Sequence, residues 1–299
     1  MADTTSSGDI GGRKRRIKLG FGFWLPMSWV IFLFFCAATA DFWPLPLPSE
    51  MHFLDQEMTP GHQSMAFINE EEVEFTFVLG TDNMGRDILA RLIHGSRVSL
   101  MVGLVSPIIG LVIGGLLGML AGYFRGRIEG IVVAVMDAVL AFPALVLLIA
   151  LTFYLGPSLT TVTFSLGILT VPFFTRVARA STLTFAKREF VLAARAIGTS
   201  DFRIIVREIL PNVFFPLLVY ALLVTAALII AEGVLGFLGL SVPPPTTSWG
   251  AMINDGRDYL EEAPHISLIP AAAMFLTVLS FNLLGDYIRS LGDPRESKL

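Results

Sequence analysis

Six long apolar stretches alternate with short polar connections along the 299-residue chain. Each stretch reaches the about 20 residues that an α-helix needs to cross the hydrocarbon core of a membrane. The stretches cover residues 19–41, 98–122, 128–154, 158–180, 213–236 and 266–289. None of them holds a run of charged residues, so the pattern predicts an all-α membrane protein with six transmembrane helices.

Basic residues are concentrated on one side of this predicted bundle. The two terminal segments, the connections after the second and fourth stretches, and the ends of the stretches that adjoin them together hold 17 of the 21 Lys and Arg residues. Because cytoplasmic segments are enriched in Lys and Arg, both termini are expected in the cytoplasm. The predicted order is a cytoplasmic tail (1–18), a first transmembrane helix (19–41), an external loop (42–97), a five-helix core (98–290) and a cytoplasmic tail (291–299).

The composition agrees with a membrane protein, since 54% of the residues are hydrophobic and only 15% are charged. A soluble domain carries roughly 25% charged residues, so a soluble enzyme and a nucleic-acid-binding module are excluded. Cys36 is the only cysteine, which excludes an intrachain disulfide. The four histidines are dispersed, and neither a metal site nor a cofactor is expected in this chain.

The first apolar stretch has an alternative interpretation as a signal peptide, with Ala38, Thr39 and Ala40 as the cleavage site. The apolar part of a signal peptide is normally about 7–15 residues long. This stretch is longer and contains Trp24 and Pro26. We therefore expect a retained transmembrane anchor.

The external loop contains two predicted elements. Polar and apolar residues alternate over residues 74–77, which indicates a short strand. Further along, four apolar residues share one helical face and predict a short helix in the outer membrane interface: Ile88, Leu89, Leu92 and Ile93. Residues 80–87 between them have the glycine spacing of a phosphate-binding loop but lack its Lys, so we interpret that match as coincidental.

The second apolar stretch carries glycines at every fourth position: Gly110, Gly114, Gly118 and Gly122. Such a stripe allows another helix to approach closely. It predicts either a contact that slides during transport or a static packing groove.

Two carboxyl groups, Asp137 and Glu232, lie inside apolar stretches. An ionisable group in a bilayer is costly and must face protein or water. A proton relay is one interpretation, and a structural, hydrogen-bonded carboxyl is the other. No intramembrane Lys, Arg or His partner is evident in the sequence, which favours the structural role.

The connection at residues 187–212 is too polar to cross a membrane and too regular to be an ordinary loop. Its first half predicts a short helix that ends at Gly198, since glycine commonly follows a helix in the left-handed conformation. Its second half predicts another short helix that Pro211 stops. The small residues Ala193 and Ala194 on the apolar stripe suit a groove in another protein better than a lipid surface.

This connection resembles the cytoplasmic EAA signature of permease subunits in ATP-binding cassette (ABC) importers. The signature is Glu-Ala-Ala, three residues, Gly, nine residues, Ile, one residue and Leu-Pro, and the matching residues are Ala193, Ala194, Gly198, Leu210 and Pro211. Leu192 replaces the glutamate and Glu208 replaces the isoleucine, two positions that vary in the dipeptide and oligopeptide branch. Segments 79–100, 136–143, 232–260 and 285–295 are similar to the C-type permease of that branch.

The resemblance implies the fold of an ABC type I importer permease in a prokaryotic inner membrane. It also implies four kinds of partner: a B-type permease, two ATPase subunits, an external binding protein and membrane lipid. ATP and magnesium would bind to the ATPase subunits, and this chain would have no catalytic residue. The residues implied to couple it to an ATPase subunit are Glu189, Ala193, Ala194, Gly198, Asp201, Leu210 and Pro211.

The implied substrate is a di- or oligopeptide, with nickel, glutathione or another small solute as alternatives. An ATP-independent secondary transporter is the alternative from a different class of protein. It predicts paired intramembrane charges or inverted repeats with broken helices. The sequence shows neither, so the importer is favoured. A purely structural membrane scaffold would leave the exposed connection at residues 187–212 unexplained.

Overall fold

The computed structural model describes residues 20–68 and 71–292. The predicted tail 1–18 and all but two residues of the tail 291–299 lie outside these residues. The long helices are α1 (Phe21–Thr39), α2 (Ile88–Phe124), α3 (Gly126–Leu140), α4 (Ala144–Leu155), α5 (Leu159–Phe185), α8 (Leu210–Phe237) and α10 (His265–Gly292). The short elements are η1 (Ala40–Phe42), β1 (His62–Ile68), β2 (Glu71–Phe77), α6 (Glu189–Ala196), α7 (Asp201–Ile204), η2 (Ile205–Ile209), α9 (Trp249–Asp255) and η3 (Arg257–Tyr259).

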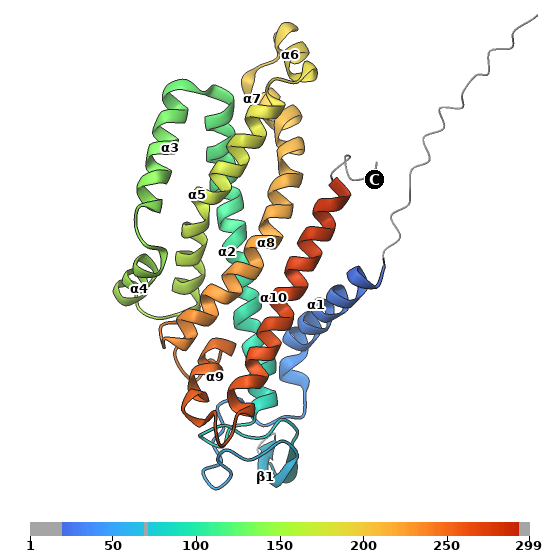
Figure 1. Cartoon of the computed structure of the whole chain (residues 1–299), viewed down its shortest axis with the longest axis vertical. Helices are drawn as coiled ribbons and strands as arrows, with labels where there is room; N and C mark the ends of the chain where they lie inside the picture. The colour runs from blue at the N-terminus through green and yellow to red at the C-terminus, as the bar shows by residue number, and fades with distance from the viewer. Residues whose placement is uncertain (1–19, 69–70, 293–299) are drawn as a thin grey trace, which may run out of the picture.

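The long helices form one elongated bundle (Figure 1). Helices α6 and α7 lie at one end of it, and the two strands and α9 lie at the other. Five helices in the described part of the chain are long and apolar enough to cross a membrane, and the pair α3–α4 makes a sixth crossing if it counts as one span. The predicted all-α membrane fold is confirmed, and the distribution of basic residues assigns the α6–α7 end to the cytoplasm.

Helix α1 is tilted away from the rest of the bundle and touches α10 (Figure 1). The Trp29 Nε1–H donates to Thr277 Oγ1 over 3.1 Å. The rings of Phe23 and Tyr287 lie 4.9 Å apart at the cytoplasmic ends of the same two helices. Helix α1 is therefore packed on the core along one side and exposes large apolar residues elsewhere.

The third predicted span is not one straight helix. Residues 128–154 are divided between α3 and α4, which are bent by 81° relative to each other. Pro143 stands at the N-cap position of α4. Proline lacks a backbone N–H and disfavours helical conformation in the residue before it, so the chain leaves the helix at Ala141 and Phe142.

The predicted interfacial helix before the second span is wrong as a separate element. Helix α2 starts at Ile88 and continues without a break to Phe124. The Asp87 side chain caps it by accepting hydrogen bonds from the backbone N–H groups of Leu89 (3.3 Å) and Ala90 (3.0 Å). Ile88 is fully buried, so this end of α2 packs against protein.

The predicted strand at residues 74–77 is confirmed as the second half of β2. It pairs antiparallel with β1, with Glu74 opposite Met65 and Phe77 opposite His62. Phe77 is fully buried beneath this hairpin. The hairpin covers the outer end of the bundle beside α9 and the start of α2 (Figure 1).

Candidate coupling site and membrane-embedded charges

Helices α6 and α7 form a small hairpin at the cytoplasmic end, and Gly198 shapes its turn. Gly198 has φ of +79°, in the left-handed region that glycine tolerates and other residues avoid. The Gly198 N–H donates to Arg195 O over 3.0 Å and the Thr199 N–H donates to Ala194 O over 3.0 Å. These two bonds define the Schellman motif, so the predicted C-terminal role of Gly198 agrees with the geometry.

The outer surface of this hairpin is unusually apolar for a cytoplasmic loop. Ile197 is 83% exposed, Phe202 78% and Leu192 52%. Ala193 is exposed, whereas Ala194 is half-buried against the apolar cluster inside the hairpin. Exposed apolar patches on a protein surface commonly mark contacts with another protein.

The inner side of the hairpin is tied to the membrane-spanning helices. Val191, Ile204 and Ile209 are fully buried in one cluster with residues of α2, α5 and α8. The Tyr123 hydroxyl at the cytoplasmic end of α2 donates to Asp201 Oδ1 over 2.5 Å. The hairpin is thus fixed on the bundle through its inner side, and movement of the hairpin would move α2 and α8 with it.

The second half of the connection differs from the prediction at Pro211. Helix α7 continues through the π-helical turn η2 directly into α8, and Pro211 lies in the first turn of α8. Proline has no N–H to donate, and it lies where the hydrogen-bonding register of the helix changes, since the Leu210 N–H donates to Ile205 O in the π-helical turn just before it. Leu210 is half-buried beside it, and Glu189 is exposed at the start of α6.

The glycine stripe of α2 lies against α5. A Cβ atom at Gly114 would lie 2.5 Å from Val171 O, and one at Gly122 would lie 2.8 Å from Thr182 Cβ. Corresponding Cβ atoms at Gly110 and Gly118 would also clash with α5. The predicted close helix–helix contact is therefore present, and its partner helix is α5.

Glu232 is fully buried in α8 and is held by hydroxyl groups from two other segments. Ser241 Oγ donates to Glu232 Oε1 over 2.7 Å, and Ser99 Oγ on α2 donates to Glu232 Oε2 over 3.3 Å. This geometry is that of a carboxyl that joins α2, α8 and the segment after α8. It fits the structural role better than a proton relay.

Asp137 does have an intramembrane partner, and the interpretation that it lacks one is wrong. Arg176 Nη2 on α5 donates to Asp137 Oδ1 on α3 over 2.6 Å. One helical turn closer to the cytoplasm, Arg179 of α5 donates to Glu129 of α3, with 2.7 Å from its Nε. Both arginines were counted with the basic residues of the cytoplasmic connection although they lie at the end of the predicted stretch 158–180, and α5 extends beyond them to Phe185.

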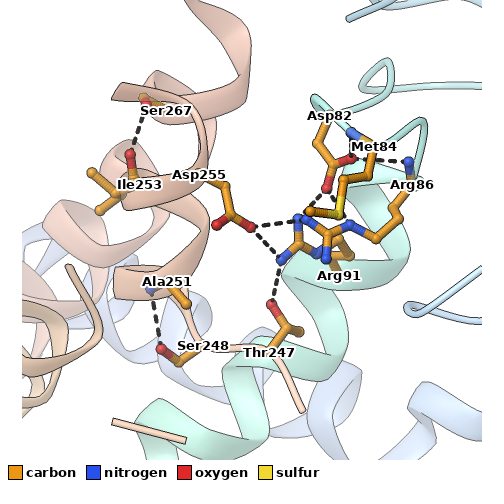
Figure 2. A network of polar contacts seen from close by, with 10 residues as sticks. All are labelled: Asp82, Met84, Arg86, Arg91, Thr247, Ser248, Ala251, Ile253, Asp255 and Ser267. Atoms are coloured by element: carbon orange, nitrogen blue, oxygen red, sulfur yellow. Dashed lines mark hydrogen bonds and ion pairs between the residues drawn. The ribbon is translucent and has the colours of Figure 1, made fainter. Parts of the chain in front are cut away.

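A network of charges that the sequence did not predict lies at the outer end of the bundle (Figure 2). Arg86 Nε donates to Asp82 Oδ2 over 2.7 Å, and Arg86 Nη2 donates to Asp255 Oδ2 over 2.9 Å. Arg91 lies between the same two carboxylates and donates to Asp82 and, over 2.9 Å, to Asp255 Oδ2. The Asp82 and Arg91 side chains are only 1% and 4% exposed. The two negative charges of the aspartates balance the two positive charges of the arginines, so this cluster has no net charge.

The network connects the segment before α2 to α9. Thr247 Oγ1 accepts a 3.3 Å hydrogen bond from Arg91, and Trp249 Nε1–H at the start of α9 donates to Leu92 O over 3.0 Å. Asp82 Oδ1 also accepts from the backbone N–H of Met84 and Arg86. The glycine-bounded segment at residues 80–87 is thus a turn built around Asp82. The signal in the sequence was the presence of Asp82, Arg86 and Arg91 in a loop otherwise poor in basic residues.

Residues 114–298 match the model of a protein family described as binding-protein-dependent transport system inner membrane component. These residues make up more than half of the chain. The chain belongs to this family. Membership identifies it as a multi-pass transport permease of a bacterial inner membrane, and it agrees with the helical bundle described above.

Curated relatives of the permease extend the match to almost its full length. It is 39% identical over 269 residues to the di/tripeptide transport system permease protein DppC of Pseudomonas aeruginosa (strain UCBPP-PA14), with 90% of this chain and 86% of the relative covered. It is also 39% identical over 216 residues to the glutathione transport system permease protein GsiD of Escherichia coli O1:K1 / APEC, with 72% of this chain and 71% of the relative covered.

Solved structures show the same permease fold. A chain of the methionine ABC transporter MetNI in an inward-facing conformation matches with a TM-score of 0.57 at 19% identity. The match covers 68% of this permease and 97% of the MetNI chain. An amino acid ABC transporter matches with a TM-score of 0.52 at 16% identity, covering 68% and 94%. The fold is that of a type I ABC importer permease.

Proposed function

We propose that this permease imports di- or oligopeptides as the C-type subunit of an ATP-driven ABC importer. It would enclose the translocation pathway together with a B-type permease, and an external binding protein would deliver the peptide. The name of the 39% identical DppC relative, which includes di/tripeptide transport, supports this substrate class. Glutathione is the second candidate substrate, because the GsiD relative is also 39% identical.

The observation that carries the proposed mechanism is the α6–α7 hairpin. Its apolar outer side (Leu192, Ile197 and Phe202) is exposed in the isolated chain, whereas its inner side is buried on α2 and α8. An ATPase subunit bound to the outer side would bury these apolar side chains. ATP binding would then close the two ATPase subunits, move the hairpins and bias the bundle between inward- and outward-facing states.

In this proposal the chain contributes no catalytic residue and binds no cofactor of its own. ATP and magnesium belong to the ATPase subunits. Glu189, Ala193, Ala194, Gly198, Asp201, Leu210 and Pro211 form the coupling hairpin and its connection to α8. The glycine stripe gives α2 and α5 a smooth contact along which one helix can move relative to the other.

The helix geometry is compatible with the alternative, an ATP-independent transporter. The paired charges Asp137 and Arg176 and the break between α3 and α4 are features that such a transporter also shows. Membership of the binding-protein-dependent family is the finding that favours the importer. A separate test must therefore address the dependence on an ATPase.

The test uses the permease with a C-terminal tag, purified from native membranes in mild detergent. We expect a second six-span permease and an ATPase to co-purify, and peptide uptake into proteoliposomes to require ATP and the binding protein. Ile197→Glu places a charge on the exposed hairpin and should release the ATPase while the permease remains in the membrane. Thr184→Glu, an exposed position on α5 outside the hairpin, is the matched control and should retain the ATPase.

Two results would overturn the proposal. One is a permease that purifies alone and still catalyses solute flux without ATP. The other is an Ile197→Glu complex that keeps its ATPase and its full transport rate. A complex that contains the ATPase but transports only a different solute would leave the importer mechanism intact and change the substrate.

A further inference from the structure

The ion pair of Asp137 and Arg176 lies within the thickness of the membrane. Arg176 precedes Phe185, the cytoplasmic end of α5, by nine residues, and Asp137 follows Gly126, the cytoplasmic start of α3, by eleven. At a rise of about 1.5 Å per residue, both charges lie roughly 14–17 Å from these helix ends. The hydrocarbon core is about 30 Å thick, so the pair lies inside it.

This ion pair is not covered by its own chain. The side chains of Arg176 and Asp137 are 58% and 53% exposed. Charged groups inside a membrane face a protein partner or a water-filled cavity, because contact with lipid costs at least a few kcal/mol each. The face of α3 and α5 that carries this pair therefore does not face lipid in the assembled transporter.

The backbone beside the pair leads to the same conclusion. Helix α3 ends three residues after Asp137, and the chain then bends by 81° into α4. Irregular backbone at membrane depth is tolerated only where protein buries it or where it lines a water-filled cavity. Phe142 in this bend is 62% exposed in the isolated chain. Two independent features thus place protein or a water-filled space, and not lipid, next to Asp137.

A cavity is present at this position. It has a volume of about 310 Å³ and is lined by Val133, Met136, Asp137, Thr175, Arg176 and Arg179. This volume is at the lower end of the range for small-molecule sites, about 300–1,000 Å³. Its wall combines one carboxylate, two guanidinium groups and a few apolar side chains. A site with both signs of charge suits a ligand that itself carries both.

We propose that this cavity lines the translocation pathway and binds the charged termini of the solute, with the ammonium group at Asp137 and the carboxylate at Arg176. The inference rests on the proposed function, because a free peptide is a dipolar ion with one group of each kind. An ion pair that is more than half exposed contributes little stability. Asp137 and Arg176 can therefore separate and each bind a charged group of the ligand at a small cost in free energy. Glu129 holds Arg179 beside the cavity and leaves Arg176 to the ligand.

The test introduces one cysteine into the assembled complex with its second permease and ATPase. Val133→Cys places a thiol on the cavity wall, and Val135→Cys, two residues along the same helix and 51% exposed, places one on the opposite face. The parent complex, whose Cys36 is buried, provides the background. The reagent is a permanently charged methanethiosulfonate that does not enter lipid. The probes are the dipeptide Ala-Ala and its N-acetyl, C-amide analogue without charged termini.

We expect the reagent to modify Val133→Cys but not Val135→Cys. Ala-Ala should slow this modification, and the uncharged analogue should not. Adding Asp137→Asn to Val133→Cys should raise the dipeptide concentration needed for protection roughly tenfold, the typical effect of losing one hydrogen bond to a charged group. The labelling needs no binding protein and no ATP, so it reports on the cavity alone.

Two outcomes would overturn this inference. An unreactive Val133→Cys would show that the second permease covers the pair. A reactive Val133→Cys that Ala-Ala and the uncharged analogue protect equally, or that neither protects, would show a wet surface without a site for charged termini. Peptide uptake by the same complex reports separately on the proposed function. If the parent complex takes up peptide and either of these labelling results is found, only the proposed binding site is rejected. If the parent complex shows no ATP-dependent peptide uptake, the proposed function itself is rejected.

Discussion

The two ends of the bundle differ in how far this chain covers its own side chains. At the outer end, Asp82 and Arg91 are almost fully buried, and each is paired within the chain. At the cytoplasmic end, Ile197 and Phe202 are about four-fifths exposed and lack any apolar cover in the described part of the chain. The charged groups of the outer end are paired within the subunit, whereas the proposed function assigns the cover of the cytoplasmic end to a partner. Substitutions should therefore affect stability at the outer end and assembly at the cytoplasmic end.

The largest loss of stability is expected from Arg91→Ala at the outer end. This change leaves Arg86 as the one basic partner shared by Asp82 and Asp255 within the described residues. Removing one partner from a buried ion pair costs about 3–5 kcal/mol. Thermal unfolding of the purified permease in detergent measures the effect.

The matched control for Arg91→Ala is Arg257→Ala, which removes an exposed pair with Asp258 at 3.4 Å. Exposed pairs contribute about 0–1 kcal/mol, so this variant should unfold close to the parent temperature. If the two variants unfold at the same temperature, the outer network does not stabilise this end of the bundle.

The second expected effect is a pH dependence of stability that arises from Asp87 at the outer end. Burial raises the pKa of Asp87 from 3.8 to about 6. The nearby carboxylate of Asp82 also raises this pKa, whereas the two hydrogen bonds from backbone N–H groups lower it. An acid with a higher pKa in the folded state favours folding below its unfolded pKa. This contribution, roughly 3 kcal/mol at 1.36 kcal/mol per pKa unit, is lost as the pH rises through 6.

Asp87→Asn tests this pH dependence because asparagine still caps a helix but does not titrate. The parent permease should lose stability between pH 4 and pH 7 relative to this variant, as measured by unfolding temperature across a pH series. Parallel curves for the two proteins would contradict the raised pKa of Asp87.

The sequence predicted most of the fold because its signals are local. Apolar length and the distribution of Lys and Arg require no knowledge of distant residues, and they gave the helical bundle and its orientation. The continuous start of α2 was missed for a different reason. Arg91 finds its partner Asp255 at a separation of 164 residues, so nothing near Ile88 indicated that this segment packs on protein.

Within the candidate site, too, the local features were predicted from the sequence and the contact between distant residues was not. Gly198 and the stripe from Gly110 to Gly122 were predicted from spacing alone, because a turn and a smooth helix face are local properties. The partner of Asp137 was missed because Arg176 is 39 residues away and lies near the cytoplasmic end of another predicted helix. Pairing allowed the membrane-spanning helix to continue through two arginines, and composition alone cannot show such pairing.

The third effect concerns the middle of the bundle, which joins the two ends. Gly118→Ala would place a Cβ 2.6 Å from Ala178 Cβ, so α2 and α5 must separate. Overpacking of this kind costs about 1–3 kcal/mol. Gly115→Ala on the same helix is the control, because its Cβ would lie at an ordinary 3.4 Å from Leu217 Cδ1. Unfolding temperature and transport rate should both fall for Gly118→Ala only; an equal fall in both variants would mean that the stripe has no special role.

The smallest effect on the stability of the chain itself is expected at the cytoplasmic end, from Gly198→Val. No atom lies within 4 Å of a Cβ at Gly198, so the change causes no clash and only forces a β-branched residue to φ of +79°. A left-handed conformation costs about 1–2 kcal/mol for such a residue. The hairpin would reduce this cost by opening its turn, which displaces Ile197 from the ATPase.

Gly198→Val should therefore unfold near the parent temperature but fail to retain the ATPase during purification. Gly198→Asn is the matched control, because asparagine tolerates the left-handed region and should retain the ATPase. The opposite pattern at Arg91→Ala, with an unstable permease, completes the contrast between the two ends. If Gly198→Val holds the ATPase as well as Gly198→Asn does, the conformation of this turn is not what couples the permease to its partner.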